Sequence, residues 1–239
     1  VGEDGKKLSK RLKNYPDPEI MINKYGADAM RYYLVSSPVM EAEALNFSES
    51  GVREMYGKLV NTLYNVLEFY QMFAASPRSG GVGVGSSKSK NILDKWIMAK
   101  LNLLVKNVTE GMEAYKLNEA SRPIVEFVTE LSQWYVRRSR DRFKGEDEED
   151  KAAALSTLRE VLVTLSKVMA PFTPFIAEKV FQATSNLSPA LSSVEERELS
   201  KPSPPQRRGQ GEVSVHLEEW PKGGKVDEKI LEEMSLIQK

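Results

Sequence analysis

"ILDKWIMAKLNLLVKNVTEGMEAY", residues 92–115, is the stretch that indicates most directly how this chain folds. Its apolar residues recur every three or four positions, which is the spacing that aligns side chains along one face of an α-helix. These residues are Leu93, Trp96, Ile97, Leu101, Leu104, Val108, Met112 and Tyr115. The stretch therefore predicts a long amphipathic helix that buries this stripe in a core.

The same periodicity recurs in three further long stretches, which are 50–74, 119–143 and 152–170. Shorter helices are predicted near 17–24, 27–36, 173–182 and 226–238. Gly26 suits a left-handed cap between the first two of these. Pro123 fits the first turn of a helix, but it would kink a helix that begins earlier. Together these patterns predict an all-α fold, a helical bundle.

Three segments lack helical periodicity. Residues 76–90, "SPRSGGVGVGSSKSK", are rich in Gly and Ser and predict a flexible linker. Residues 185–212 are polar and rich in Pro, and we expect them to be irregular or disordered. In 213–217 apolar and polar residues alternate, which favours a short strand or extended segment before the last helix.

The composition excludes several classes of protein. Among 239 residues, 41% are hydrophobic and 28% are charged, which is typical of a globular protein. There is no cysteine and a single histidine, His216, so the sequence predicts no disulfide and no metal site. No apolar run approaches the roughly 20 residues that span a bilayer, and no signal peptide is visible. We therefore expect a cytoplasmic protein with no membrane contact.

The chain opens with a basic loop. Within "DGKKLSKRLKNYPDP", residues 4–18, five cations fall within the eight residues 6–13. A lysine-rich loop suits the neutralisation of phosphate charge, because lysine acts as a movable point charge. A solvated basic tail is the alternative. Because the first residue is Val1 and the first segment is polar, we expect a piece of a longer chain or a processed product.

Lys7-Leu8-Ser9-Lys10-Arg11 resembles the Lys-Met-Ser-Lys-Ser loop of the class I aminoacyl-tRNA synthetases. The segments "LKNYPDP", "KYGADAMRYYLVSSPV", "LNFSESGVREM", "WYVRRSRDRF", "VMAPFTPFIAEKVFQ" and "SVHLEEWP" resemble the isoleucyl members in the same order. The resemblance implies an end of the catalytic domain at 1–15 and a connector at 16–47. It further implies an anticodon-binding helical bundle at 48–184, followed by irregular 185–212 and a short strand and terminal helix at 213–239.

The resemblance also implies a role for the opening loop. Lys7, Leu8, Ser9 and Lys10 would bind ATP, with Lys7 and Lys10 as catalytic residues on the triphosphate. ATP with Mg²⁺ and isoleucine would be bound through a catalytic domain that precedes the loop in the family. That domain carries a His-x-Gly-His element, which these 239 residues lack. We therefore expect no tightly bound cofactor and no adenylate synthesis by this chain alone.

A second basic cluster lies in "WYVRRSRDRFK", residues 134–144. Arginines near a helix C-terminus interact favourably with the helix dipole, which is a purely structural interpretation. The resemblance favours tRNA(Ile) as a partner. It makes Arg137, Arg138, Arg140 and Arg142 the candidate tRNA-binding residues.

Two alternatives remain at this point. The chain could be a stand-alone tRNA-binding or scaffold protein without catalysis. It could also be the equivalent portion of a valyl, leucyl or methionyl enzyme.

Overall fold

The computed structural model describes residues 17–74, 89–185 and 214–238. Helices account for most of these residues, which confirms the predicted all-α class, and the described ranges contain no strand. The first part consists of α1 (Pro18–Tyr25), α2 (Ala27–Val35), the 3₁₀ turn η1 (Pro38–Glu41), α3 (Glu49–Met55), the π-helical turn η2 (Tyr56–Asn61) and α4 (Thr62–Ala74). The second part consists of α5 (Ile92–Glu113), α6 (Leu117–Glu130), the π-helical turn η3 (Leu131–Val136), α7 (Arg140–Lys144), α8 (Glu148–Met169), α9 (Pro174–Ser185), the 3₁₀ turn η4 (Val215–Leu217) and α10 (Glu228–Gln238).

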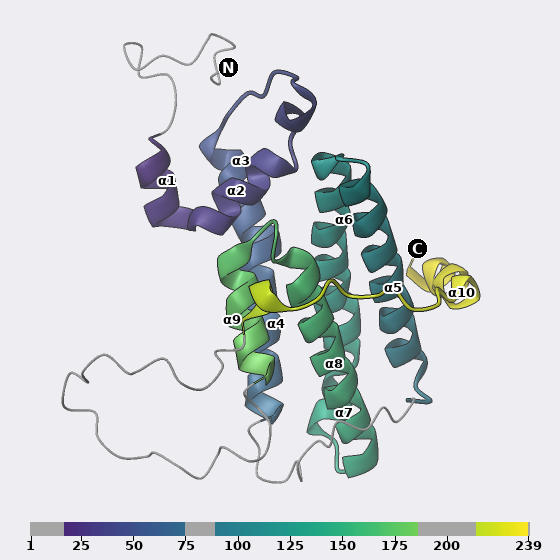
Figure 1. Ribbon diagram of the computed structural model, residues 1–239. Coiled ribbons are helices and arrows are strands. Elements are labelled where there is room, and N and C mark those ends of the chain that lie inside the picture. Colours follow the sequence, from purple (N-terminus) through teal and green to yellow (C-terminus); the bar gives the residue numbers. More distant parts are fainter. Residues whose placement is uncertain (1–16, 75–88, 186–213, 239) are drawn as a thin grey trace, which may run out of the picture.

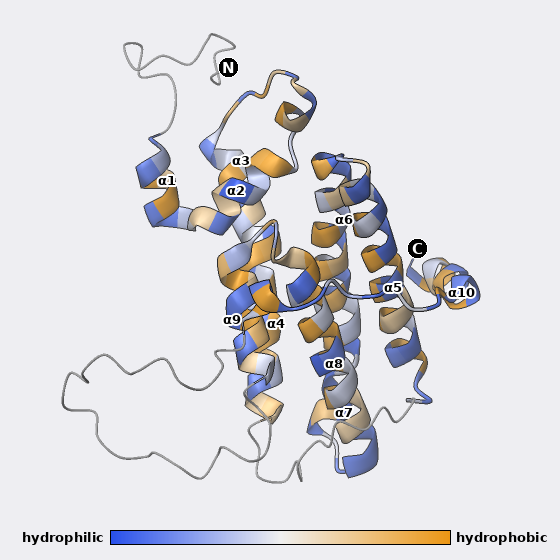
Figure 2. Ribbon diagram, viewed as in Figure 1, coloured by the Kyte–Doolittle hydropathy of each residue, from blue (hydrophilic) through white to orange (hydrophobic). Residues whose placement is uncertain are grey.

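The long helices form an antiparallel bundle, and α1–α3 lie at one of its ends (Figure 1). Apolar residues line the sides of the helices that face one another, as Figure 2 shows. The stripe that opened the sequence is the centre of this core: Trp96, Ile97, Leu101, Leu104 and Val108 are all buried. The one clear exception is Tyr115, which is 91% exposed because α5 ends before it.

The helix ends follow local chemistry. The side chains of Asp17, Asn91 and Asp147 each accept a hydrogen bond from a backbone N–H of the first turn of α1, α5 and α8 respectively. Gly26 separates α1 from α2 with φ of +82°, where glycine is favoured, but its ψ of 157° is not left-handed helical. The cap was therefore predicted at the correct residue with the wrong backbone geometry.

Two of the predicted long helices are interrupted. In 50–74 the helix continues through the π-helical turn η2, and in 119–143 it passes through η3 and then breaks at Ser139. α6 begins at Leu117, so Pro123 lies inside the helix rather than in its first turn. Periodicity located these helices but did not reveal the extra residue that a π-helical turn inserts.

Of the two alternatives expected at 213–217, a short strand or an extended segment, the strand does not form. Val215–Leu217 forms the 3₁₀ turn η4, and Val213 lies outside the described residues. The Glu178 carboxylate on α9 accepts hydrogen bonds from the Ser214 hydroxyl and the Val215 N–H, both at 2.9 Å. The segment therefore pairs with a helix side chain instead of another strand.

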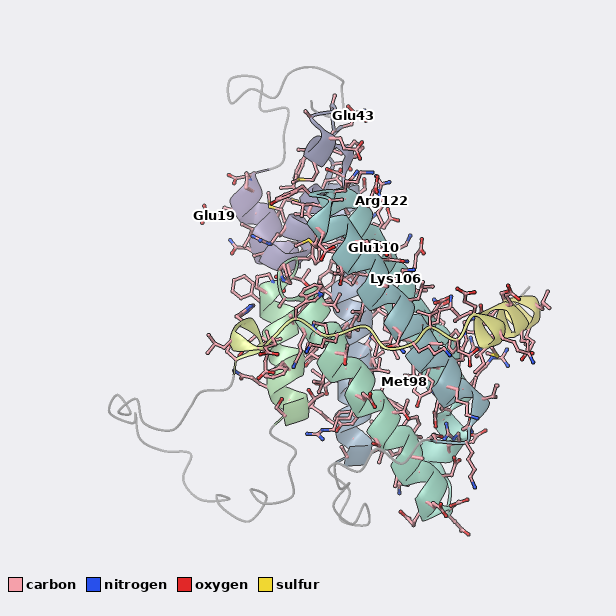
Figure 3. The ribbon with its side chains drawn as sticks, turned by 45° about the vertical axis from the view of Figure 1, so that its right-hand side comes forward. Glu19, Glu43, Met98, Lys106, Glu110 and Arg122 are labelled. Carbon is pink, nitrogen blue, oxygen red and sulfur yellow. The ribbon has the colours of Figure 1, made fainter. Side chains whose placement is uncertain are left out.

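Residues 218–227 cross the bundle and bring α10 against α5 (Figure 1). Lys167 pairs with Glu218 at 2.7 Å, and the Trp220 indole N–H donates to the Thr109 hydroxyl at 2.9 Å. The outer faces of the helices are polar: Figure 3 shows Lys106 and Glu110 one turn apart on α5. None of the described helices is long and apolar enough to cross a membrane.

At the other end, α1–α3 have a small core of their own, made of Met21, Tyr25, Ala29 and Val52. Hydrogen bonds join this unit to the bundle. The buried carboxylate of Asp28 accepts from the Ile176 N–H at 2.7 Å, so a residue of α2 caps the start of α9. The Tyr32 hydroxyl donates to the Ser121 carbonyl on α6. We call this junction the connector end.

Candidate nucleic-acid interface

The predicted arginine cluster lies at the end of the bundle opposite α1–α3, where η3 leads into α7 (Figure 1). Arg137, Arg138 and Arg140 are exposed, and none of them forms an ion pair within the described ranges. We call this end of the bundle, which presents these three residues, the arginine end. Exposed guanidinium groups with free N–H donors are suited to phosphate oxygens.

An aromatic residue supports one of these arginines. The Arg138 guanidinium lies 4.1 Å from the centre of the Trp134 ring, which is a cation–π arrangement. Trp134 is half-buried, whereas its neighbour Tyr135 is fully buried in the core. Stacking on the indole restricts the guanidinium to one face of the protein.

The fourth arginine has a different role, which corrects the prediction for Arg142. Its side chain is only 12% exposed, and it donates to Asp94 at 2.8 and 2.9 Å and to Asp150 at 2.7 to 3.0 Å. These bonds tie α7 to the start of α5 and of α8. Because they occupy most of its donors, we remove Arg142 from the candidate tRNA-binding residues.

Electrostatics explain why this buried network is stable. Burial opposes the charge of Arg142, but the hydrogen bonds of Asp94 and Asp150 outweigh it and raise the Arg142 pKa. The same guanidinium lowers the Asp150 pKa through its hydrogen bonds. Burial, and then the Asp94 charge, raise the pKa of Tyr135 well above its usual value, so its hydroxyl stays protonated and donates to Asp94 at 2.8 Å. The network therefore fixes both η3 and α7, between which the exposed arginines lie.

A groove that the sequence did not predict lies between α3–η2–α4 and α6–η3. Its volume is about 980 Å³, and Arg53, Lys58, Glu126 and Gln133 are among its lining residues. Lys58 lies within the π-helical turn η2, Gln133 lies within η3, and Arg53 precedes η2 by three residues. Because π-helical turns are not visible as periodicity, no signal in the sequence pointed to this groove.

The remaining predicted site residues are those of the opening loop. Lys7, Leu8, Ser9 and Lys10 are outside the described residues, so their assignment stays a prediction. In the connector, Lys24 forms an ion pair with Glu49, and Arg31 donates to the Pro171 carbonyl at 3.1 Å. The structure does not bring these two residues into one cluster with the arginine end, because they lie at the opposite end of the bundle.

Two protein-family models match parts of the chain. A model of the anticodon-binding domain of tRNA ligase matches residues 94–239, and a model of the class I tRNA synthetases for I, L, M and V matches residues 1–46. The chain belongs to the family of tRNA ligase anticodon-binding domains.

The chain is also similar to isoleucine–tRNA ligases, which confirms the resemblance seen in the sequence. The isoleucine–tRNA ligase of Chlamydia trachomatis serovar D is 46% identical over 187 residues, covering 76% of this chain and 18% of the relative. The cytoplasmic isoleucine–tRNA ligase of Schizosaccharomyces pombe is 42% identical over 195 residues, covering 79% of this chain and 18% of the relative. The chain thus spans about a fifth of the length of these relatives.

A solved structure shares the fold. It is described as the ternary complex of an Agrobacterium radiobacter K84 leucyl enzyme, agnB2 LeuRS, with tRNA and LeuAMS. The TM-score is 0.59 at 20% identity, and the match covers 96% of this chain and 23% of that chain.

Proposed function

We propose that this chain is part of an isoleucine–tRNA ligase, which activates isoleucine with ATP and Mg²⁺ and transfers it to tRNA(Ile). Its share of that activity is the binding of tRNA by the bundle and of the ATP phosphates by the opening loop. The similarity to isoleucine–tRNA ligases over three quarters of the chain supports the reaction. A cytoplasmic location, as in the name of the S. pombe relative, is part of the proposal.

The observation that carries the tRNA-binding role is the arginine end. Arg137, Arg138 and Arg140 are exposed and unpaired within the described part of the chain, while Arg142 fixes α7, which carries Arg140 and directly follows the other two. Cations that contact phosphates release condensed counterions, which gives affinity without base specificity. The tRNA complex of the structural relative supports RNA as the partner of this fold.

The test is a double substitution at the arginine end of the 239-residue chain. Arg137→Ala with Arg138→Ala should weaken tRNA binding and lower the slope of log K against log salt by about 1 per lost phosphate contact. Lys106→Ala, on the outer face of α5, is the matched control and should leave both unchanged. Unchanged affinity of the double variant at low salt would contradict the tRNA-binding role.

The ATP-binding role of the loop needs a separate experiment. In the complete ligase, Lys7→Ala or Lys10→Ala should lower kcat for isoleucine-dependent pyrophosphate exchange, because each removes a cation from the departing phosphates. The 239-residue chain should show no exchange, since it lacks the His-x-Gly-His element. Full activity of a ligase that lacks both lysines would refute this part of the proposal.

A reading frame that continues upstream of Val1 and encodes that element would support the ligase. A native start codon near Val1 would favour a stand-alone tRNA-binding protein.

A further inference from the structure

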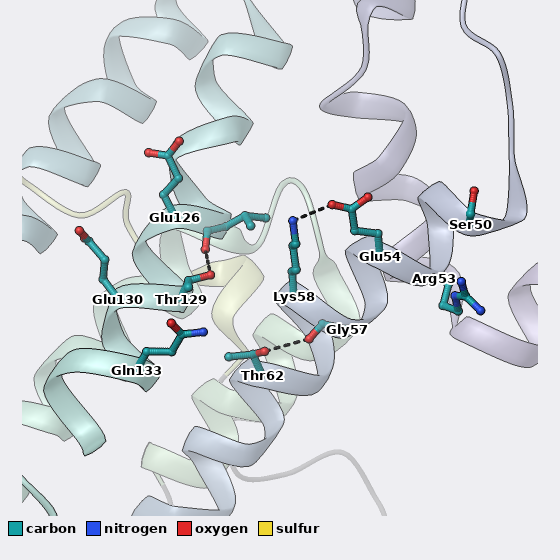
Figure 4. Close-up of a pocket in the computed structure, with 11 residues that line it drawn as sticks. Ser50, Arg53, Glu54, Gly57, Lys58, Thr62, Glu126, Thr129, Glu130 and Gln133 are labelled. Atoms are coloured by element: carbon teal, nitrogen blue, oxygen red, sulfur yellow. Dashed lines mark hydrogen bonds and ion pairs between the residues drawn. The ribbon is translucent and has the colours of Figure 1, made fainter. Parts of the chain in front are cut away.

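The groove between α3–η2–α4 and α6–η3 has two chemically different walls (Figure 4). Arg53 and Lys58 lie on the first wall, together with Glu54. Glu126, Glu130 and Gln133 lie on the second wall. One wall thus offers cations and the other offers hydrogen-bond acceptors.

The charges in the groove are balanced. Lys58 pairs with Glu54 at 2.6 Å, and Glu130 pairs with Lys100, just outside the groove, at 2.9 Å. The side chains of Arg53, Glu126 and Gln133 form no hydrogen bond or ion pair with any residue that the structure describes. The groove therefore has one free cation, one free carboxylate and one free amide, and these free groups face solvent.

Two π-helical turns shape the groove. At the end of η2 the Thr62 hydroxyl donates to the Gly57 carbonyl at 2.8 Å (Figure 4). A Cβ atom at Gly57 would meet nothing within 4 Å, so the glycine leaves open space in the groove. Turns of this kind occur frequently at functional sites.

An RNA strand matches this arrangement of walls. Its phosphates carry negative charge along one edge, and its 2′-hydroxyls donate hydrogen bonds from the sugar, which a carboxylate or amide oxygen can accept. A groove for phosphate alone would carry an excess of cations, whereas this groove has three cations and three carboxylates when Lys100 is included.

We propose that the groove binds the ribose–phosphate backbone of one RNA strand. Arg53 and Lys58 contact phosphates, and Glu126 and Gln133 accept hydrogen bonds from 2′-hydroxyls. Arg137 follows Gln133 by about one helical turn, so the groove leads toward the arginine end. This continuity favours RNA over a peptide or a small metabolite. The inference rests on the proposed tRNA-binding function and adds a second, RNA-specific contact to it.

The first experiment fills the groove without removing any contact of the fold. Gly57→Met places a side chain in the open space and raises helix propensity, so folding should be preserved. We expect the dissociation constant of the 239-residue chain for tRNA to rise at least 10-fold, with no decrease in Tm. Asn61→Met is the matched control, because Asn61 is exposed on the same π-helical turn but does not line the groove. Equal affinities of the two variants would overturn the proposal.

The second experiment tests the 2′-hydroxyl directly. The probes are tRNA and the same tRNA with 2′-deoxy residues in one strand of the anticodon stem. The wild-type chain should prefer the first probe, and Glu126→Ala with Gln133→Ala should reduce that preference several-fold. Arg53→Ala should weaken the binding of both probes equally and lower the slope of log K against log salt. Glu113→Ala, which changes an exposed residue of α5, is the control and should alter neither the preference for 2′-hydroxyls nor the salt slope.

The outcomes separate this inference from the proposed function. If Arg137→Ala with Arg138→Ala weakens tRNA binding while the groove variants do not, the arginine end binds RNA and the groove does not. If the preference for 2′-hydroxyls survives the loss of Glu126 and Gln133, the assignment of these two residues is wrong. If no variant at either place affects binding, both proposals fail.

Discussion

The two ends of the bundle are joined by different chemistry. At the connector end, α2 is attached to the bundle through hydrogen bonds to the backbone: Asp28 caps α9 and Tyr32 donates to a carbonyl of α6. At the arginine end, side-chain charges join the helices: Arg142 lies between Asp94 and Asp150. The pKa values reflect this difference, because burial raises the pKa of Asp28 while the Arg142 hydrogen bonds lower that of Asp150.

The two junctions stabilise a carboxylate inside a helical protein in different ways. Backbone N–H groups at a helix start are partial charges, and for Asp28 they oppose the cost of burial without outweighing it. A bidentate guanidinium is a full charge, which is what the nearly inaccessible Asp94 (2% exposed) requires. The arginine end should therefore depend far more on a single residue than the connector end does.

The largest effect is expected for Arg142→Ala. It leaves the buried Asp94 carboxylate without its counter-charge, with only the Tyr135 and Ser89 hydroxyls as donors. Breaking a buried ion pair in this way costs about 3–5 kcal/mol. The free energy of unfolding from urea denaturation measures this loss. Arg140→Ala is the matched control two residues away, and because Arg140 is exposed it should change stability by no more than about 0.5 kcal/mol. Similar values for the two variants would remove the distinction between the buried and exposed arginines.

A smaller loss is expected for Asp28→Ala at the connector end. The variant removes the acceptor for the N–H groups at the start of α9, and losing such a cap costs about 1–2 kcal/mol. Asp28→Asn keeps an acceptor oxygen and should recover most of the loss in the same denaturation assay. A loss for Asp28→Ala as large as that for Arg142→Ala would show that the two ends are equally dependent on one side chain.

Lowering the pH should change the contributions of the two ends to stability in opposite directions. Because the folded pKa of Asp28 is raised, its protonation favours the folded state, and the stability of wild type relative to Asp28→Asn should increase as pH falls through that pKa. The lowered pKa of Asp150 has the opposite sign: the stability of wild type relative to Asp150→Asn should be present above about pH 4 and decrease below it. Urea denaturation between pH 3 and 6 compares the two slopes, and slopes of the same sign would contradict this account.

The smallest effect is expected for Trp134→Leu. The cation–π contact contributes about 0.5–1 kcal/mol, and leucine keeps part of the apolar contact that the half-buried indole makes with the core, so the stability should fall by about 1 kcal/mol. The Arg138 guanidinium would lose the surface that orients it, and tRNA affinity should decrease about two- to three-fold. If the affinity falls as far as in Arg138→Ala, the indole itself contacts the RNA.

Local pattern predicted the helices well because each long helix buries one stripe, and a stripe is a property of neighbouring residues. The centres of the stripes, such as Trp96 and Leu158, are fully buried in the structure. The same reasoning missed both π-helical turns, since one inserted residue changes the periodicity only slightly. It also predicted a strand near Val215, where the Glu178 carboxylate from a distant helix decides the local conformation.

The candidate site was also only partly predictable from the sequence. The sequence identified the arginine cluster but did not separate Arg142 from Arg138, because both are arginines on a helix beside aromatic residues. The difference comes from Asp94 and Asp150, which approach only when α5 and α8 pack against α7. The groove consists of residues from 50–62 and 125–133, and their distance along the chain concealed it.

The amino-acid sequence alone was enough to predict that this protein is helical, where most of its helices lie, and to which family it belongs. All of these depend on residues that are close together in the chain or on the order of its motifs. Which charges are structural and which are available to a partner became visible only in the folded protein, because the state of a charged side chain depends on its solvent exposure and on the groups within a few ångströms of it. Here those groups come from other helices.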